Sequence, residues 1–168
     1  DIDTGAAPPL EKAEDTQDQI MHKIEADVNK TMVESAELAA KAKWSEAIDL
    51  AKKAVTLEKQ LSKLKEEDNP DTFNTDLTYA VNLHVGSIYQ SADMLSEALH
   101  VYQGIVKSKM FDRAGRLRAN MGNIYFAQKN YLQAVKQYQQ ALDQLPYPQQ
   151  KMRNKIIRNI GHAWVHLG

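Results

Sequence analysis

The chain of 168 residues has no cysteine, which excludes disulfide bridges, thiolate catalysis and cysteine-based zinc sites and is compatible with a reducing compartment. Alternating runs of Val, Ile and Thr bounded by turn residues are also missing, so the sequence gives no signal for β-strands. No apolar run approaches the length of a membrane span, and the opening Asp1-Ile2-Asp3-Thr4 does not begin a signal peptide. These absences favour an all-α chain that is not inserted in a membrane.

Residue sets that carry catalysis are missing as well. No Ser/His/Asp set, glycine-rich phosphate loop or converging pair of carboxylates is present. His162 and His166 have the i, i+4 spacing of a metal site on a helix, but Ala163 stands where H-E-x-x-H has its Glu, and no third ligand is evident. We therefore expect no enzyme activity, no cofactor, no bound metal and no small-molecule substrate.

Nucleic acid and membrane surfaces are poor partners for this composition. Basic residues cluster between positions 107 and 118, yet the net charge is −1 and no exposed aromatic residues are interleaved with them. The stripe formed by Ile20, Ile24 and Val28 predicts a core face rather than a membrane-lying helix, because the polar face of that helix carries as many acids as lysines.

What the chain does contain is a repeat. Met121-Gly122-Asn123-Ile124-Tyr125 is followed by Ala134, Tyr138, Ala141 and Pro146. This order of small, aromatic, small, aromatic and helix-ending residues is that of a tetratricopeptide repeat (TPR), a pair of short antiparallel helices. Because one such pair cannot bury its apolar faces alone, the motif predicts a stack of pairs, an architecture that binds other proteins.

A second copy precedes this one. Gly86 and Tyr89 are followed by Ala98 and Tyr102, and Gly86 lies 36 residues before Gly122. This spacing is close to the roughly 34 residues of a standard unit. The shared register favours true repeats over an ordinary helical bundle with coincidental spacing.

Two further copies are incomplete. Gly161 and Trp164 repeat the start of the motif, and the chain ends at Gly168 after one helix of that unit. At the other end, Trp44-Ser45-Glu46-Ala47 resembles the turn between the paired helices and gives a degenerate first unit at roughly residues 28–61. With no initial Met and an end inside a repeat, the chain is interpreted as a fragment of a longer solenoid.

Each recurring residue has a predicted packing role. Glycine in mid-helix costs about 1 kcal/mol relative to alanine, so Gly86, Gly122 and Gly161 are expected where two helix backbones approach closely. The aromatic residue three positions later fills the space beside that contact. Ala98 and Ala134 serve the same purpose on the second helices, and a proline at position 146 ends the last of these.

The predicted fold is therefore all-α, a right-handed α-α superhelix of about three TPRs plus the first helix of a fourth. We expect a flexible lead at 1–10, a long helical hairpin holding the degenerate first TPR at 11–67, TPRs at 75–110 and 111–147, and the first helix of a truncated TPR at 148–168. Helices are expected near 11–42, 45–67, 75–91, 95–109, 113–128, 131–145 and 148–167.

The net charge hides an asymmetry between the two halves. Residues 1–84 hold 18 acids and 10 bases, whereas residues 85–168 hold 4 acids and 11 bases. Solvated helix faces that happen to differ in sign are one explanation. The other is partner choice, because opposed fields steer association and set register.

Helical spacing predicts where a partner would bind. If Met121, Gly122 and Tyr125 face the neighbouring helix, the opposite stripe of the same helix, which includes Ala119, lines the concave groove. The candidate groove residues on this stripe and its counterpart one unit later are Arg116, Asn123, Phe126, Lys155, Arg158, His162 and His166. Such a groove should take an acidic segment, with Phe126 as an apolar contact.

Longer stretches carry a more specific resemblance. Residues 76–79, 106–111, 114–125, 141–146 and 155–161 closely resemble, in order, the large TPR subunits of the intraflagellar transport B complex, the polaris family. The resemblance spans roughly residues 74–164 and is weak over 1–66. It is specific because Arg116, Asn120 and Asp143 match at places that the general TPR pattern leaves free.

This resemblance implies a non-catalytic scaffold. Its partners would be other subunits of the transport B complex, and its role would be assembly of the cilium or flagellum and transport along the axoneme. The implied location is the cilium or flagellum and the basal body region, on the cytoplasmic side. The alternative keeps the fold as an adaptor of co-chaperone type that recognises an acidic segment. Asn123 occupies one clamp site of such adaptors, but Ala119 stands where their lysine would be, so the clamp is incomplete.

Overall fold

The structure is a computed structural model that describes residues 5, 15–71, 74–108, 114–145 and 148–168. In these ranges it contains seven α-helices and no strand, so the predicted all-α TPR superhelix is the fold observed. The helices are α1 (Gln17–Ala40), α2 (Trp44–Asp68), α3 (Thr75–Ser91), α4 (Leu95–Lys107), α5 (Gly115–Ala127), α6 (Tyr131–Gln144) and α7 (Gln150–Leu167).

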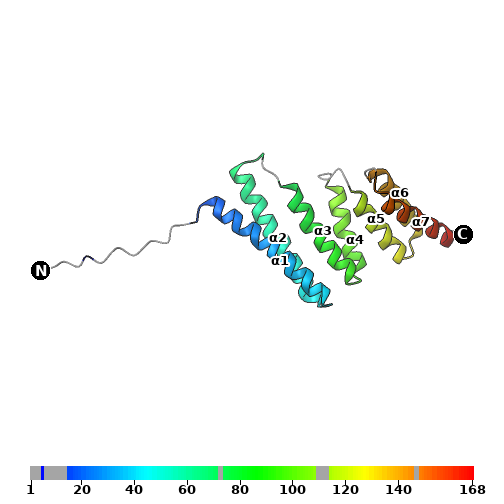
Figure 1. Ribbon diagram of the computed structural model, residues 1–168, viewed down its shortest axis with the longest axis horizontal. Helices are drawn as coiled ribbons and strands as arrows, with labels where there is room; N and C mark the ends of the chain where they lie inside the picture. The colour runs from blue at the N-terminus through cyan, green and yellow to red at the C-terminus, as the bar shows by residue number, and fades with distance from the viewer. Residues whose placement is uncertain (1–4, 6–14, 72–73, 109–113, 146–147) are drawn as a thin grey trace.

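Successive helices pack as antiparallel pairs that are stacked side by side (Figure 1). The pairs α1/α2, α3/α4 and α5/α6 have the most extensive contacts, and α7 packs on α6 as the last element of the chain. Between pairs, α2 contacts α3 closely. The result is an elongated stack in which each unit touches only its neighbours, as in a solenoid.

The first helix begins later than position 11 because a cap sets its start. Thr16 accepts a hydrogen bond from the Gln19 backbone N–H at 3.4 Å, and the Gln19 side chain accepts one from the Thr16 backbone N–H at 2.8 Å. This reciprocal pair satisfies backbone donors that have no partner inside the helix. The expected lead at 1–10 and the start at residue 11 lie almost wholly outside the described residues.

The same turn joins the two helices of every pair. Ala42, Asp93 and Lys129 adopt positive φ angles of 57°, 60° and 61°, each two residues before the second helix begins. In each turn a backbone N–H donates to the carbonyl five residues earlier: Lys43 to Leu38, Met94 to Tyr89 and Asn130 to Tyr125, at 2.8–2.9 Å. The first pair therefore has the geometry of the later repeats even though its sequence pattern is degenerate.

Small residues on the second helices allow the stack to close. Ala47, Ala98 and Ala134 are each 0% exposed and lie in the first turn of α2, α4 and α6. Tyr102 and Tyr138, one turn further on, are the largest fully buried side chains in the described ranges. Each hydrophobic cluster combines residues of adjacent helices, so the core is continuous along the stack.

The motif glycines make close contacts of a different kind from the one expected. A Cβ on Gly86 would collide with the ring of Tyr102, and a Cβ on Gly122 would lie 2.5 Å from Tyr138 Cε1. In both units the neighbour is therefore an aromatic side chain from the second helix rather than another backbone. Tyr89 and Tyr125 are half-buried beside these contacts.

Gly161 differs from the other two glycines. No heavy atom lies within 4 Å of the position that its Cβ would take, so the close contact expected there is absent in this structure. Trp164, the aromatic residue paired with it in the motif, is 51% exposed. In the two earlier units the covering ring comes from the helix that follows, and α7 is the last helix that the structure describes. Pro146, the expected helix stop, lies outside the described residues.

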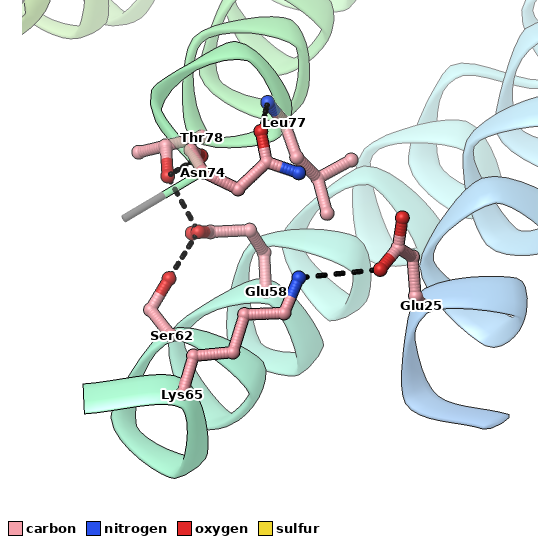
Figure 2. Close-up of polar contacts among 7 residues, drawn as sticks. All are labelled: Glu25, Glu58, Ser62, Lys65, Asn74, Leu77 and Thr78. Atoms are coloured by element: carbon pink, nitrogen blue, oxygen red, sulfur yellow. Dashed lines mark hydrogen bonds and ion pairs between the residues drawn. The ribbon is translucent and has the colours of Figure 1, made fainter. Parts of the chain in front are cut away.

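A buried carboxylate joins the first pair to the second. Glu58 on α2 is 4% exposed, and its Oε1 atom accepts hydrogen bonds from the hydroxyls of Ser62 and Thr78, both at 2.6 Å (Figure 2). Thr78 lies on α3, whose start is capped by Asn74. Hydrogen bonds from both helices thus compensate the burial of this group. An ion pair of 3.3 Å between Lys65 and Glu25 links α2 to α1 nearby (Figure 2).

Candidate functional site

The candidate site is the region where side chains of α5, α6 and α7 meet. Its base is the buried Tyr138 side chain, whose hydroxyl donates a 2.7 Å hydrogen bond to Asn123 Oδ1. Burial raises the pKa of Tyr138 to about 12, so the hydroxyl keeps its proton at neutral pH and remains a donor. The ring that covers Gly122 therefore also holds the amide of Asn123 in place.

Three helices line a small, partly open cavity at this point. Its volume is about 130 Å³, and its lining residues are Asn123, Phe126, Tyr138, Asn159 and His162. Asn159 on α7 donates its side-chain amide toward Asn123 Oδ1 at 3.4 Å. Because two donors use the carbonyl oxygen of Asn123, its NH₂ group is the part that can donate to a ligand.

An aromatic cluster adjoins the cavity through Phe126. The rings of Tyr131 and His166 stack in parallel, with centroids 4.5 Å apart and an interplanar angle of 3°. Phe126 presents an edge-to-face contact to each of them, at 5.2 Å from Tyr131 and 5.7 Å from His166. Such packing fixes the orientation of the rings and gives the groove a rigid apolar wall.

Arg116 lies at a second cavity. This cavity has a volume of about 500 Å³, and its lining residues are Arg116, Pro148, Gln149, Gln150, Lys151 and Met152. Burial raises the pKa of Tyr79 on α3, and the positive charge of Arg116 partly offsets that effect, which places the guanidinium near α3 as well. The structure thus separates Arg116 from the group formed by Asn123, Phe126 and His162.

Lys155 and Arg158 are exposed on α7. In the sequence they lie between Lys151, which lines the larger cavity, and His162, which lines the smaller one. Ala119, expected on the groove stripe, is instead 8% exposed and packs with Tyr138 and Ile156. Ala119 belongs to the buried cluster that joins residues of α5, α6 and α7. The stripe predicted from helical spacing is therefore interrupted in its middle.

Other arginines of the basic half have structural roles. Arg118 donates to the side-chain oxygens of three glutamines on α6, at 2.7–3.2 Å, and Arg153 donates to the Leu142 carbonyl at 2.8 Å. The two ion pairs in the described ranges, Lys65–Glu25 and Lys30–Glu34, both lie in α1 and α2. Within those ranges, no acid neutralises the exposed bases of α5 and α7.

Sequence reasoning missed Tyr131 and Asn159, and it gave Tyr138 a packing role alone. Asn159 lies one helical turn before His162, so the same spacing argument could have included it. No signal in the sequence predicts the stacking of Tyr131 on His166, because it depends on the angle between α6 and α7.

In the described part of the chain, none of the helices combines the length and the apolar composition that a membrane span needs. The same ranges contain no group of three or more His, Asp or Glu side chains that could hold a metal ion.

Comparison with known proteins places this geometry in context. A family model described as tetratricopeptide repeat matches residues 116–148, which cover α5 and α6. Over 166 residues the chain is 41% identical to a human protein described as intraflagellar transport protein 88 homolog. The match covers 98% of this chain and 20% of the relative, so the chain spans about a fifth of the length of that curated protein.

Proposed function

We propose that this chain is a TPR segment of the intraflagellar transport protein 88 family and serves as a non-catalytic scaffold. Its α5/α7 groove holds segments of neighbouring transport subunits. In this role it contributes to assembly of the cilium or flagellum and to transport along the axoneme. Its location is then the cilium or flagellum and the basal body region, on the cytoplasmic side.

The observation that carries this proposal is the combination of shape and charge at the groove. A rigid wall formed by Phe126, Tyr131 and His166 stands beside polar side chains that can bind a peptide backbone. Exposed Arg116, Lys155 and Arg158 add positive charge that no acid in the described ranges neutralises. Aromatic side chains and arginine are the residues that most often dominate protein–protein interfaces.

The test reverses the charge at the groove. Full-length protein carrying Arg116→Glu and Arg158→Glu is expressed in flagellated cells and purified with its partners for mass spectrometry. We expect reduced recovery of transport B subunits with unchanged helical content. A matched control reverses Lys107 and Lys136, which are exposed and line neither groove cavity. Normal recovery of those subunits by the groove variant would refute the groove assignment.

One position in the chain argues against the co-chaperone alternative. A carboxylate clamp would need a lysine where Ala119 stands, and Ala119 faces the core. In the same purification, recovery of chaperones without transport subunits would support the alternative and refute the scaffold.

A further inference from the structure

The two cavities between α5 and α7 lie at a defined distance from each other. We infer that they form one bipartite site for an extended acidic segment: a carboxylate binds at the Arg116/Lys151 cavity, and an apolar side chain three residues away binds at the Asn123/Phe126/His162 cavity. This inference rests on the proposed function and specifies the kind of segment that the groove holds.

The spacing follows from helix geometry. Arg116 and Asn123 are seven residues apart on α5, which is two turns, so both lie on the same stripe of the helix. At a rise of 1.5 Å per residue their separation along the axis is about 10 Å. An extended peptide advances about 3.3 Å per residue, so three residues cover the distance.

A row of bases on α7 connects the two cavities. Lys151, Lys155, Arg158 and His162 follow each other at intervals of four, three and four residues, which places them on one face of the helix. Lys151 lines the larger cavity and His162 the smaller one. A segment that enters both cavities therefore runs along the positive charges of Lys151, Lys155 and Arg158.

Charge identifies the occupant as an acidic polypeptide. The exposed bases of this row have no ion-pair partner in the described ranges, so an incoming carboxylate does not have to displace an acid of the chain. A long polyanion such as nucleic acid fits less well, because residues 1–84 carry 18 acids against 10 bases and would repel phosphates beyond the row. A short acidic segment avoids that repulsion.

The smaller cavity suits an apolar side chain rather than a second acid. Its wall is the Phe126 ring, held by edge contacts to Tyr131 and His166, and the buried Tyr138 lies behind it. The NH₂ group of Asn123 lies at the same cavity and can donate to a carbonyl of the bound backbone. A peptide anchored by one carboxylate and one apolar side chain would be fixed in register.

The probe is a set of fluorescein-labelled peptides in a Gly/Ser background. Each contains two adjacent glutamates and one leucine, placed one to six residues from the nearer glutamate on either side. Fluorescence anisotropy at two salt concentrations gives Kd for each peptide. We expect the tightest binding at a separation of three residues, by about fivefold over the other separations, and weaker binding at higher salt.

Variants assign the two ends of the site. Arg116→Glu and Lys151→Glu should each weaken binding of the best peptide by about tenfold, whereas Lys136→Glu, an exposed lysine of α6 outside both cavities, should change Kd less than about twofold. Phe126→Ala should remove the preference for one separation while leaving the salt dependence, because only the apolar anchor is lost. Unchanged helical content by circular dichroism shows that each variant is folded.

The remaining outcomes separate this inference from the scaffold proposal. Equal affinity for all separations would overturn the bipartite site but leave a groove that binds acidic segments. A peptide affinity that Arg116→Glu and Lys151→Glu do not change would overturn both. Displacement of the peptide by single-stranded DNA at equal affinity would overturn the polypeptide assignment. Concentration-dependent dimers that Arg116→Glu abolishes would instead assign the groove to the acidic helices of a second copy. The scaffold proposal fails separately, if the natural full-length protein recovers chaperones without transport subunits.

Discussion

Tyr138 lies across Gly122 so closely that a Cβ on the glycine would be 2.5 Å from Tyr138 Cε1, and the hydroxyl of the same ring bonds Asn123 at 2.7 Å. The ring of Tyr138 thus packs between α5 and α6, and its hydroxyl holds a groove residue in place. Tyr102 repeats the arrangement one unit earlier, with its ring over Gly86 and its hydroxyl bonded to Gln90 at 3.0 Å. Packing of the repeat and shape of the groove are therefore coupled.

Gly122→Ala should destabilise the fold by about 1–3 kcal/mol, because the fully buried ring of Tyr138 would have to shift away from the added methyl group. Urea unfolding followed by circular dichroism measures the change. Gly161→Ala is the matched control: nothing lies within 4 Å of its Cβ position, so alanine should stabilise α7 by up to about 1 kcal/mol through helix propensity. Equal effects at both positions would contradict the ring contact.

Ala42→Gly should stabilise the chain. Ala42 has a φ angle of 57°, a left-handed conformation that costs about 1–2 kcal/mol for residues with a Cβ and little for glycine. Since glycine also increases the entropy of the unfolded chain, we expect a net gain of about 0.5 kcal/mol in the free energy of unfolding. Ala36→Gly, at an exposed mid-helix position of α1, should instead cost about 1 kcal/mol. A loss of stability at Ala42 similar to that at Ala36 would count against the turn geometry.

Alkaline pH should weaken the fold through Tyr138. Burial raises its pKa to about 12 from an ordinary value of 10.0, so above pH 10 the folded chain binds more protons than the unfolded chain. The stability that the protonated Tyr138 contributes is fully present below pH 10 and is lost as pH rises toward 12. At pH 11 the loss in the free energy of unfolding is about 1 kcal/mol. Tyr138→Phe should be less stable at pH 8 and should show a shallower decline above pH 10. Parallel pH profiles for the two proteins would exclude this role.

Mildly acidic pH should lower the stability of the fold through His84, which lies at the contact between α1, α2 and α3. Its Nε2 atom lies 3.0 Å from Ser35 Oγ, and Ser35 donates its own proton to the Ala47 carbonyl, so the imidazole is the donor. Burial lowers the pKa of His84 from 6.5, and the unfolded chain therefore binds more protons as pH falls below that value. The free energy of unfolding should decline below about pH 6.5.

The measurement for His84 is a comparison of variants. His84→Gln should make the free energy of unfolding fall less between pH 7.5 and 5.5 than it does in the natural chain, because the titrating group is gone. His100→Gln, at an exposed position of α4, controls for loss of a histidine in general and should keep the natural slope. If both variants have the same slope, His84 does not carry the pH dependence.

The fold could be predicted because its information is local and repeated. Residues such as Ala98, Ala134, Tyr102 and Tyr138 recur at a fixed spacing, and the spacing alone implies paired helices. The range expected for α3 matches the observed Thr75–Ser91, and most other helix ends differ from expectation by a few residues. Cap geometry accounts for the largest shift, at Thr16.

The groove was only partly predictable because its shape depends on the angle between helices. Spacing within α5 placed Ala119, Asn123 and Phe126 on one stripe, but Ala119 is buried in the cluster that joins α5, α6 and α7. The position of α7 also brings Asn159 to Asn123. A single-helix argument cannot supply that angle. It also cannot show which glycines are covered by a ring from the following helix, which is why it predicted the same contact at Gly161 as at Gly122.

Part of the apolar surface of α7 is exposed. Ile157 is 53% exposed and Trp164 is 51% exposed, next to the uncovered Gly161, whereas the equivalent glycines in α3 and α5 are covered by a ring from the following helix. We therefore expect that a chain lengthened by the next helix pair of the same protein melts at a higher temperature, because neighbour interfaces carry much of a solenoid's stability. In that longer chain Gly161→Ala should change from stabilising to destabilising, and Trp164 should become less accessible to quenching by iodide. Trp44, which is half-buried on α2, is the other tryptophan, so Trp44→Phe isolates the Trp164 signal. A longer chain with an unchanged melting temperature and an unchanged effect of Gly161→Ala would show that this face is not packed in the way the two earlier units are.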